Sequence, residues 1–172
     1  MNSIFKSSLS HQYIERFLTK VPDWEKIIFN IDLNILSKHP IKSLFNYGIV
    51  LHEIFNIEEV DFILNEIKNN NPNNPNNSYS AHVYISLSKE SKTFGKHKDE
   101  SDVWYWQCIG STQWKIFEFN KTISYTLEPG DIIYVPKGIF HDVIPLSPRV
   151  GISFGLDYLN KNKNVNTKLI YL

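Results

Sequence analysis

Three residues in the second half of the chain have the side-chain types of a metal site. His97 and Asp99 are separated by one residue, so on an extended strand both side chains would point to the same face and could reach one ion. His141 follows 44 residues after His97, behind a turn that contains Pro136 and Gly138. Two histidines and one carboxylate on one face of a metal leave its opposite coordination positions open. We therefore expect His97, Asp99 and His141 to be the metal ligands and the catalytic residues.

The His-x-Asp pattern alone is a weak signal. With 6 His and 8 Asp in 172 residues, chance predicts about 0.3 such pairs. His97 could be a solvated residue in the charged run KHKDESD, and His141 a partly buried strand histidine. The context favours the metal site, because the pair stands at the predicted start of a strand and His141 follows a turn and a second apolar strand. Two His and one carboxylate are the ligand set of non-haem Fe(II) enzymes that react with O₂.

The composition is that of one globular domain, with 42% hydrophobic and 21% charged residues. Lys+Arg and Asp+Glu both number 18, so no net positive charge favours phosphate binding and we expect no nucleic-acid partner. No apolar run approaches the ~18 residues of a membrane span, and the first residues lack an apolar signal core. We therefore expect a cytoplasmic protein without a membrane partner. Cys108 is the single cysteine, which excludes an intramolecular disulfide and a multi-thiolate metal site.

The first part of the chain has helical periodicity. Residues 11–20 place four apolar side chains on one face, and Asp23 could cap a second helical segment. Residues 57–69 are the clearest helix, and residues 47–54 are a candidate strand. The run NNNPNNPNN at 69–77 predicts an exposed loop. We expect a helical N-terminal region at 1–78, packed on a core at 79–160, and a C-terminal tail at 161–172.

After this loop the apolar period becomes two. Residues 81–88 alternate apolar and polar side chains, which predicts a half-buried strand. Turns rich in Gly and Pro separate five further candidate strands, at 103–109, 113–119, 131–135, 140–144 and 149–156. Several short strands at close spacing favour a sandwich or barrel. The expected fold class is α+β, mainly β.

Residues 80 to 158 resemble the JmjC-type branch of the cupin family. The most specific match is the segment 127–141, LEPGDIIYVPKGIFH. Other matching segments follow the family order and spacing, at 84–86, 93–99, 107–115 and 151–155. The region from 80 to 158 covers a little under half of the chain.

This resemblance implies a double-stranded β-helix, the cupin or jelly-roll fold, as the core. It implies Fe(II) held by His97, Asp99 and His141, with 2-oxoglutarate as the cosubstrate and O₂ as the oxidant. The implied reaction converts 2-oxoglutarate to succinate and CO₂ and hydroxylates a C–H bond of the substrate. Many relatives hydroxylate protein side chains, and some of those demethylate lysines.

The chain departs from the family where the distal carboxylate of 2-oxoglutarate should bind. Most JmjC-like oxygenases have Lys or Arg two residues after the glycine that matches Gly110, whereas this chain has Thr112. A buried carboxylate without a cation is costly. Arg149 is a candidate replacement, because it shares a strand face with Ser153, whose family equivalent points toward the metal. The expected cosubstrate-binding residues are Arg149, Thr112, Tyr84 and Ser153, against the alternative that Arg149 is a solvated residue at the rim.

The two-residue period of a strand also predicts which face each residue after the metal motif points to. Tyr105 and Gln107 share parity with His97 and Asp99 and are candidates for the pocket mouth. The neighbouring tryptophans at 104 and 106 face the opposite side, where a helix could pack on them.

Two other functions remain open. Thr112 leaves room for a cupin metalloenzyme that does not use 2-oxoglutarate, such as an isomerase or an O₂-only dioxygenase. A non-catalytic cupin binding module is the other, although a scaffold has no use for three convergent metal ligands. The substrate, a protein side chain or a small molecule, is not identified by the sequence. The N-terminal helices are candidates for a pocket wall or a homodimer interface.

Overall fold

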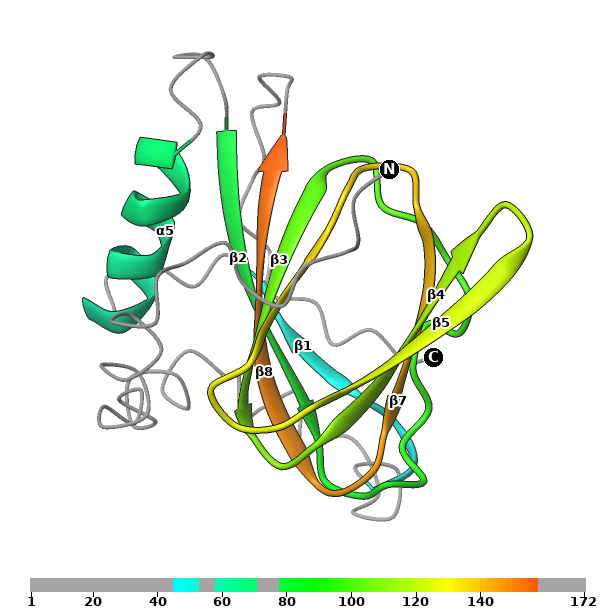
Figure 1. Cartoon of the computed structure of the whole chain (residues 1–172). Coiled ribbons are helices and arrows are strands. Elements are labelled where there is room, and N and C mark those ends of the chain that lie inside the picture. Colours follow the sequence, from blue (N-terminus) through cyan, green and yellow to red (C-terminus); the bar gives the residue numbers. More distant parts are fainter. Residues whose placement is uncertain (1–44, 53–57, 71–77, 158–172) are drawn as a thin grey trace.

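The structure is a computed structural model that describes residues 45–52, 58–70 and 78–157 (Figure 1). The helices predicted before residue 45, the Asn/Pro-rich run at 71–77 and the tail at 161–172 lie outside these residues. The helical N-terminal region and the homodimer interface therefore stay predictions, as do the domain boundaries. The part of the chain that the structure describes holds no helix long and apolar enough to cross a membrane.

In the described residues, eight antiparallel strands form two sheets. The larger sheet consists of β1 (Ile49–Leu51), β2 (Ser78–Ser86), β8 (Arg149–Asp157), β3 (Asp102–Ile109) and β6 (Ile132–Val135), in this spatial order. The smaller sheet consists of β5 (Lys121–Leu127), β4 (Thr112–Glu118) and β7 (Phe140–Pro145). The chain changes sheet after β3, β5, β6 and β7, which is the connectivity of a jelly roll. The mainly β prediction is confirmed.

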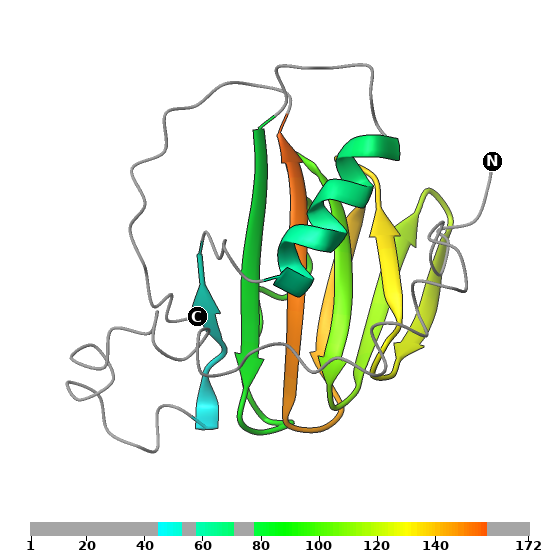
Figure 2. The ribbon, with the colours of Figure 1, turned by 90° about the vertical axis from the view of Figure 1, so that its left-hand side faces the viewer.

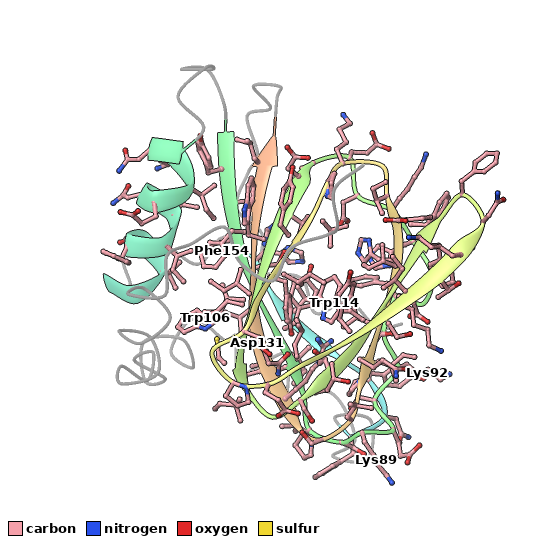
Figure 3. All side chains as sticks on the ribbon, in the orientation of Figure 1. Lys89, Lys92, Trp106, Trp114, Asp131 and Phe154 are labelled. Atoms are coloured by element: carbon pink, nitrogen blue, oxygen red, sulfur yellow. The ribbon has the colours of Figure 1, made fainter. Side chains whose placement is uncertain are left out.

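The two sheets share one interior. Strand β4 buries alternate residues, because a period of two places Trp114 and Ile116 on its inner face. They join one apolar cluster with inward residues of the larger sheet, among them Tyr105 and Ile133. Figure 3 labels Trp114 in the space between the sheets. This apolar cluster surrounds the pocket described below.

The outer face of the larger sheet is covered by helix α5 (Glu58–Asn70), which confirms the helix predicted at 57–69 (Figure 2). Its buried stripe has helical spacing and consists of Val60, Ile63, Leu64 and Ile67. The stripe belongs to the same cluster as Trp104 and Trp106 of β3. The prediction that these tryptophans face a helix is therefore confirmed, and β3 turns its other side chains toward the pocket.

Strand β5 is absent from the sequence prediction. Ile123, Tyr125 and Leu127 do alternate with polar residues, so the signal was present. β5 is an edge strand that pairs only with β4, and its polar side chains are exposed. Three inward residues supply all its apolar character, which is why the segment resembles a loop in composition. The strands predicted between 81 and 156 are confirmed, with ends shifted by a few residues.

Candidate active site

A cavity of about 230 Å³ lies between the two sheets and is lined by residues of both. Two groups of functional side chains reach it. One group, His97, Asp99 and His141, comes from the segment before β3 and from β7, and we call it the metal group. The other contains Arg149 on β8 and Tyr105 on β3, both from the larger sheet.

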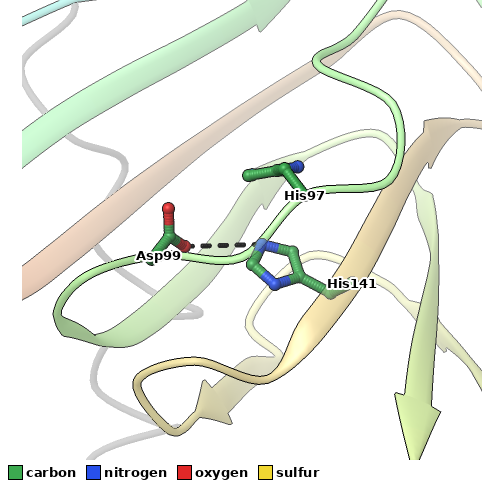
Figure 4. Close-up of side chains that lie close together, drawn as sticks. All are labelled: His97, Asp99 and His141. Carbon is green, nitrogen blue, oxygen red and sulfur yellow. Dashed lines mark ion pairs between the residues drawn. The ribbon is translucent and has the colours of Figure 1, made fainter.

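The metal group is brought together by the backbone. His97 and His141 exchange two backbone hydrogen bonds, from His97 N to His141 O at 2.9 Å and from His141 N to His97 O at 2.7 Å. Their ring centroids lie 4.3 Å apart. His141 Nε2 lies 3.4 Å from Asp99 Oδ2 (Figure 4). One ligand atom from each residue lies within 4.8 Å of the other two, so small side-chain adjustments would place all three around one ion.

Backbone carbonyls orient both imidazoles. His97 Nδ1 lies 2.8 Å from the carbonyl oxygen of Gly95, and His141 Nδ1 lies 3.1 Å from that of Ile139. A carbonyl oxygen only accepts, so each Nδ1 carries the hydrogen and each Nε2 keeps its lone pair. Metal-bound histidines usually have such a partner on their second nitrogen. Both rings therefore keep Nε2 available to a metal.

A tight turn holds the backbone beside Asp99. The Asp99 carbonyl oxygen accepts a hydrogen bond from Gly138 N at 3.0 Å. Gly138 has a φ of 80°, a left-handed conformation that glycine adopts without steric cost. The turn that precedes β7 thus ties His141 and Asp99 to the same part of the barrel.

His141 is buried, and its ring stacks on Trp114 with centroids 5.4 Å apart and an interplanar angle of 18°. Burial lowers the pKa of His141, although the carbonyl of Ile139 and the carboxylate of Asp99 act in the opposite direction. The neutral imidazole is the form that binds metals. The surroundings of His141 therefore favour the metal-binding form at neutral pH.

Arg149 begins β8 and lies inside the barrel, only 5% exposed. Its Nε donates a hydrogen bond to Ser86 Oγ at 3.1 Å, and its Nη1 donates one to the Tyr105 hydroxyl at 2.7 Å. These bonds use two of the five N–H donors of a guanidinium. No ion pair between described residues includes Arg149. A buried cation that lines a cavity and has no carboxylate partner is suited to bind an anionic ligand.

Two other predicted site residues also line the cavity. Tyr84 and Ser153 project from the neighbouring strands β2 and β8. Burial raises the pKa of Tyr84, with Asp99 adding to the effect, so its hydroxyl stays protonated at neutral pH and can donate a hydrogen bond.

The expectation for Thr112 needs correction. Thr112 faces inward as predicted, but its hydroxyl donates a hydrogen bond to Gln107 Oε1 at 2.8 Å, and it is not among the described residues that line the cavity. The Gln107 amide donates in turn to the carbonyl oxygens of Ile109 and Gly110. This chain of bonds connects Thr112 to the β3–β4 turn. Thr112 is therefore not placed to donate to a ligand, and Gln107 does not lie at the pocket mouth.

Sequence reasoning missed three residues at the site. Ser86, which lies directly across from Arg149 in the β2–β8 pairing, shares a face with Tyr84, so period two could have predicted its inward direction but not its pairing with Arg149. Trp114 lines the cavity behind His141. His52 follows β1 and lines the cavity beside His82, with the two Nδ1 atoms 3.2 Å apart.

Comparisons with known proteins find a JmjC domain model and ribosomal oxygenases or hydroxylases. The family model of the JmjC domain matches residues 115–164. The ribosomal protein uL16 3-hydroxylase of Escherichia coli is 30% identical over 91 residues, which cover 42% of this chain and 24% of that protein. A probable ribosomal oxygenase of Haemophilus influenzae is 28% identical over 98 residues, which cover 45% of this chain and 24% of that protein. The matches therefore span about a quarter of the length of these curated relatives.

One similar solved structure is YcfD, a ribosomal oxygenase from Escherichia coli in complex with cobalt and 2-oxoglutarate. It is 18% identical, with a TM-score of 0.47, and the similarity covers 77% of this chain and 45% of that chain. The matched part of the JmjC model contains strand β7 with His141 and strand β8 with Arg149. With this match and the two curated relatives, the chain is similar to JmjC-type cupin proteins over part of its length.

Proposed function

We propose that the protein is an Fe(II)- and 2-oxoglutarate-dependent oxygenase, which hydroxylates its substrate with O₂ and releases succinate and CO₂. The observation that carries this proposal is a His-Asp-His ligand set and a buried guanidinium without a carboxylate partner in one cavity. 2-Oxoglutarate has a group for each of them, a keto acid for the metal and a distal carboxylate for Arg149. The match of residues 115–164 to the JmjC domain model supports the same activity.

The donor set of the metal group fits Fe(II). Two imidazole nitrogens and one carboxylate suit iron better than magnesium or calcium, which prefer oxygen ligands. His97, Asp99 and His141 would hold the ion, with both histidines neutral. When bound, the iron supplies open coordination positions for the cosubstrate and O₂ and carries the oxidative chemistry.

The other residues of the cavity would bind and orient 2-oxoglutarate. Arg149 would pair with the distal carboxylate through the N–H donors that Ser86 and Tyr105 do not use. The protonated Tyr84 would donate a further hydrogen bond, and Ser153 would lie beside the bound molecule. In this arrangement the cation lies on β8, whereas the family position on β4 holds Thr112.

The apolar part of the lining would limit the water around a bound ligand. Val103, Trp114 and Val143 are buried and line the cavity. A dry wall strengthens the ion pair that Arg149 would form, because the effective dielectric constant is lower than in water. Phe94 is the exposed residue among the described lining, and it would contact a substrate that enters there.

The first substrate class to test is a side chain of a ribosomal protein. The two curated relatives are named as a ribosomal protein hydroxylase and a probable ribosomal oxygenase. A small-molecule substrate is the other class, and succinate formation in the presence of each candidate would distinguish them.

An anaerobic titration with Fe(II) and 2-oxoglutarate tests the proposal. We expect a visible metal-to-ligand charge-transfer band in the wild type, loss of the band in His141→Ala, and an unchanged band in Lys115→Ala. Lys115 is a suitable control because it lies on β4 next to Trp114 but on the outward side. Tight Fe(II) binding without a band would indicate a cupin metalloenzyme that does not use 2-oxoglutarate. Failure to bind Fe(II) would indicate a non-catalytic binding module.

A further inference from the structure

The guanidinium of Arg149 needs a fixed orientation to bind a carboxylate through two parallel hydrogen bonds. An arginine side chain is long, and restricting its rotamers costs conformational entropy. Arg149 is held before any ligand binds, by Ser86 at Nε and by Tyr105 at Nη1. The bond to Tyr105 is the shorter of the two, 2.7 Å against 3.1 Å.

Tyr105 occupies space that a glycine leaves free. A Cβ atom added to Gly151 would overlap the hydroxyl oxygen and the Cζ atom of Tyr105. The φ of Gly151 is not in the left-handed region, so its backbone conformation does not require glycine. The missing side chain therefore matters because it lets the Tyr105 ring lie over β8 and reach Arg149. On its other side the ring contacts Trp114, with centroids 4.9 Å apart.

The Tyr105 hydroxyl orients Arg149 without neutralising its charge. Burial raises the pKa of Tyr105, although the nearby Arg149 opposes this effect. The hydroxyl therefore stays protonated, and its oxygen accepts from Arg149 as a neutral partner. A phenolate or a carboxylate at this place would form an ion pair with the guanidinium and compete with an anionic ligand.

We propose that Tyr105 is a positioning residue, which lies over Gly151 and holds Arg149 so that its remaining N–H donors face the distal carboxylate of the bound cosubstrate. This inference rests on the proposed use of 2-oxoglutarate. It adds a dependence that the position of Arg149 alone does not imply: selectivity for a dicarboxylate is increased by the hydroxyl of residue 105 and by the absence of a side chain at residue 151.

A comparison of two ligands tests this role. Binding of 2-oxoglutarate and of 2-oxopentanoate, which has a methyl group in place of the distal carboxylate, would be measured by calorimetry in the presence of Mn(II). Tyr105→Phe should weaken 2-oxoglutarate about fivefold to tenfold, because it removes one hydrogen bond to a charged group, and should leave 2-oxopentanoate unchanged. Tyr134→Phe, which removes a hydroxyl on the adjacent strand β6 outside the cavity lining, is the matched control and should change neither. An equal loss for both ligands, or no loss for either, would overturn the role of Tyr105.

A second pair of variants tests the part played by Gly151. Gly151→Ala should weaken 2-oxoglutarate selectively, because its Cβ displaces Tyr105. In a Tyr105→Leu background the same substitution should cause little further loss, since the shorter side chain no longer meets the added methyl group. Additive losses in the double variant would contradict the proposed coupling. The Tyr105→Phe comparison stands on its own if the leucine variant does not fold.

Arg149→Ala separates failure of this inference from failure of the proposed function. If the wild type binds both ligands equally, 2-oxoglutarate is not recognised by its distal carboxylate, and this inference falls with that part of the proposed function. If the wild type prefers 2-oxoglutarate, Arg149→Ala abolishes this preference and Tyr105→Phe leaves it undiminished, then only the inference about Tyr105 is wrong.

Discussion

The metal group and the residues around Arg149 are built in different ways. His97 and His141 are fixed by reciprocal backbone hydrogen bonds, and the carbonyls of Gly95 and Ile139 orient their rings. Arg149 is fixed by two side chains from neighbouring strands, Ser86 and Tyr105. The set of Arg149, Ser86 and Tyr105 is called the anchor group below.

This difference bears on why one group keeps the family pattern and the other departs from it. Moving a metal ligand would break the backbone bridge that also joins the segment before β3 to β7. A cationic side chain that binds the distal carboxylate can lie at any inward position near the same end of the barrel, provided that neighbouring side chains orient it. In this chain Thr112 packs on Gln107, and Arg149 lies on β8 instead. The two groups should therefore respond separately to mutation.

The largest effect is expected from His141→Ala. The variant removes one of three proposed ligands, and affinity for Mn(II) should fall more than ~100-fold, since even the partners behind metal ligands are worth about 10- to 100-fold. Titration followed by the electron paramagnetic resonance of free Mn(II) measures this change. Unchanged affinity would remove His141 from the metal group.

Arg149→Ala should weaken the binding of 2-oxoglutarate and not that of the metal. Breaking a buried charge pair costs about 2 kcal/mol or more, so affinity for 2-oxoglutarate should fall about 30-fold or more. Affinity for Mn(II) alone should stay within about twofold, because Arg149 is outside the metal group. Arg149→Lys keeps the charge but not the planar fork, and should lie between the wild type and the alanine variant. Equal losses of metal and 2-oxoglutarate would mean that the two groups are not separate.

A lower pH should weaken metal binding by the metal group. Both histidines must be neutral to bind a metal, so protons compete with it. Because burial lowers the pKa of His141, competition at this residue should begin below its ordinary value of 6.5 and increase toward pH 5. Affinity for Mn(II) should therefore fall between pH 7 and pH 5, by at most about tenfold per pH unit for each proton that competes with the metal. Constant affinity over this range would be incompatible with two histidine ligands.

The smallest effect is expected from Ser86→Ala. It removes the hydrogen-bond acceptor of Arg149 Nε and keeps the Tyr105 bond, so affinity for 2-oxoglutarate should fall about fivefold, or about 1 kcal/mol. Metal affinity should not change. Ser124→Ala, at an exposed position of β5, is the control and should affect neither ligand. A loss as large as that of Arg149→Ala would mean that Ser86 contacts the ligand directly.

The nearness of His97 and Asp99 could be predicted because its signal is local, in the spacing of the two residues. That His141 joins them depends on a backbone bridge to a segment 44 residues away, which is expected from the family resemblance and not from spacing. The inward direction of Arg149 also follows from strand parity. Its partners do not, because Ser86 and Tyr105 approach it only through the register of β2 and β3 on β8, which a single sequence does not contain.

Thr112 and β5 show where the prediction failed. Parity gave the correct direction for Thr112, but parity says nothing about depth along the barrel or about a competing partner such as Gln107. β5 was missed because an edge strand with exposed polar residues has little apolar character. In both cases the sequence does not tell which other segment pairs with the residue or the strand.

A crystal structure of the protein with Mn(II) and 2-oxoglutarate, grown without O₂, tests the central claim most directly. The account predicts the metal on His97, Asp99 and His141, and the distal carboxylate within hydrogen-bond distance of the Arg149 guanidinium. A carboxylate bound beside Thr112, with Arg149 still paired only to Ser86 and Tyr105, would contradict the account. So would a metal that lacks any of the three ligands.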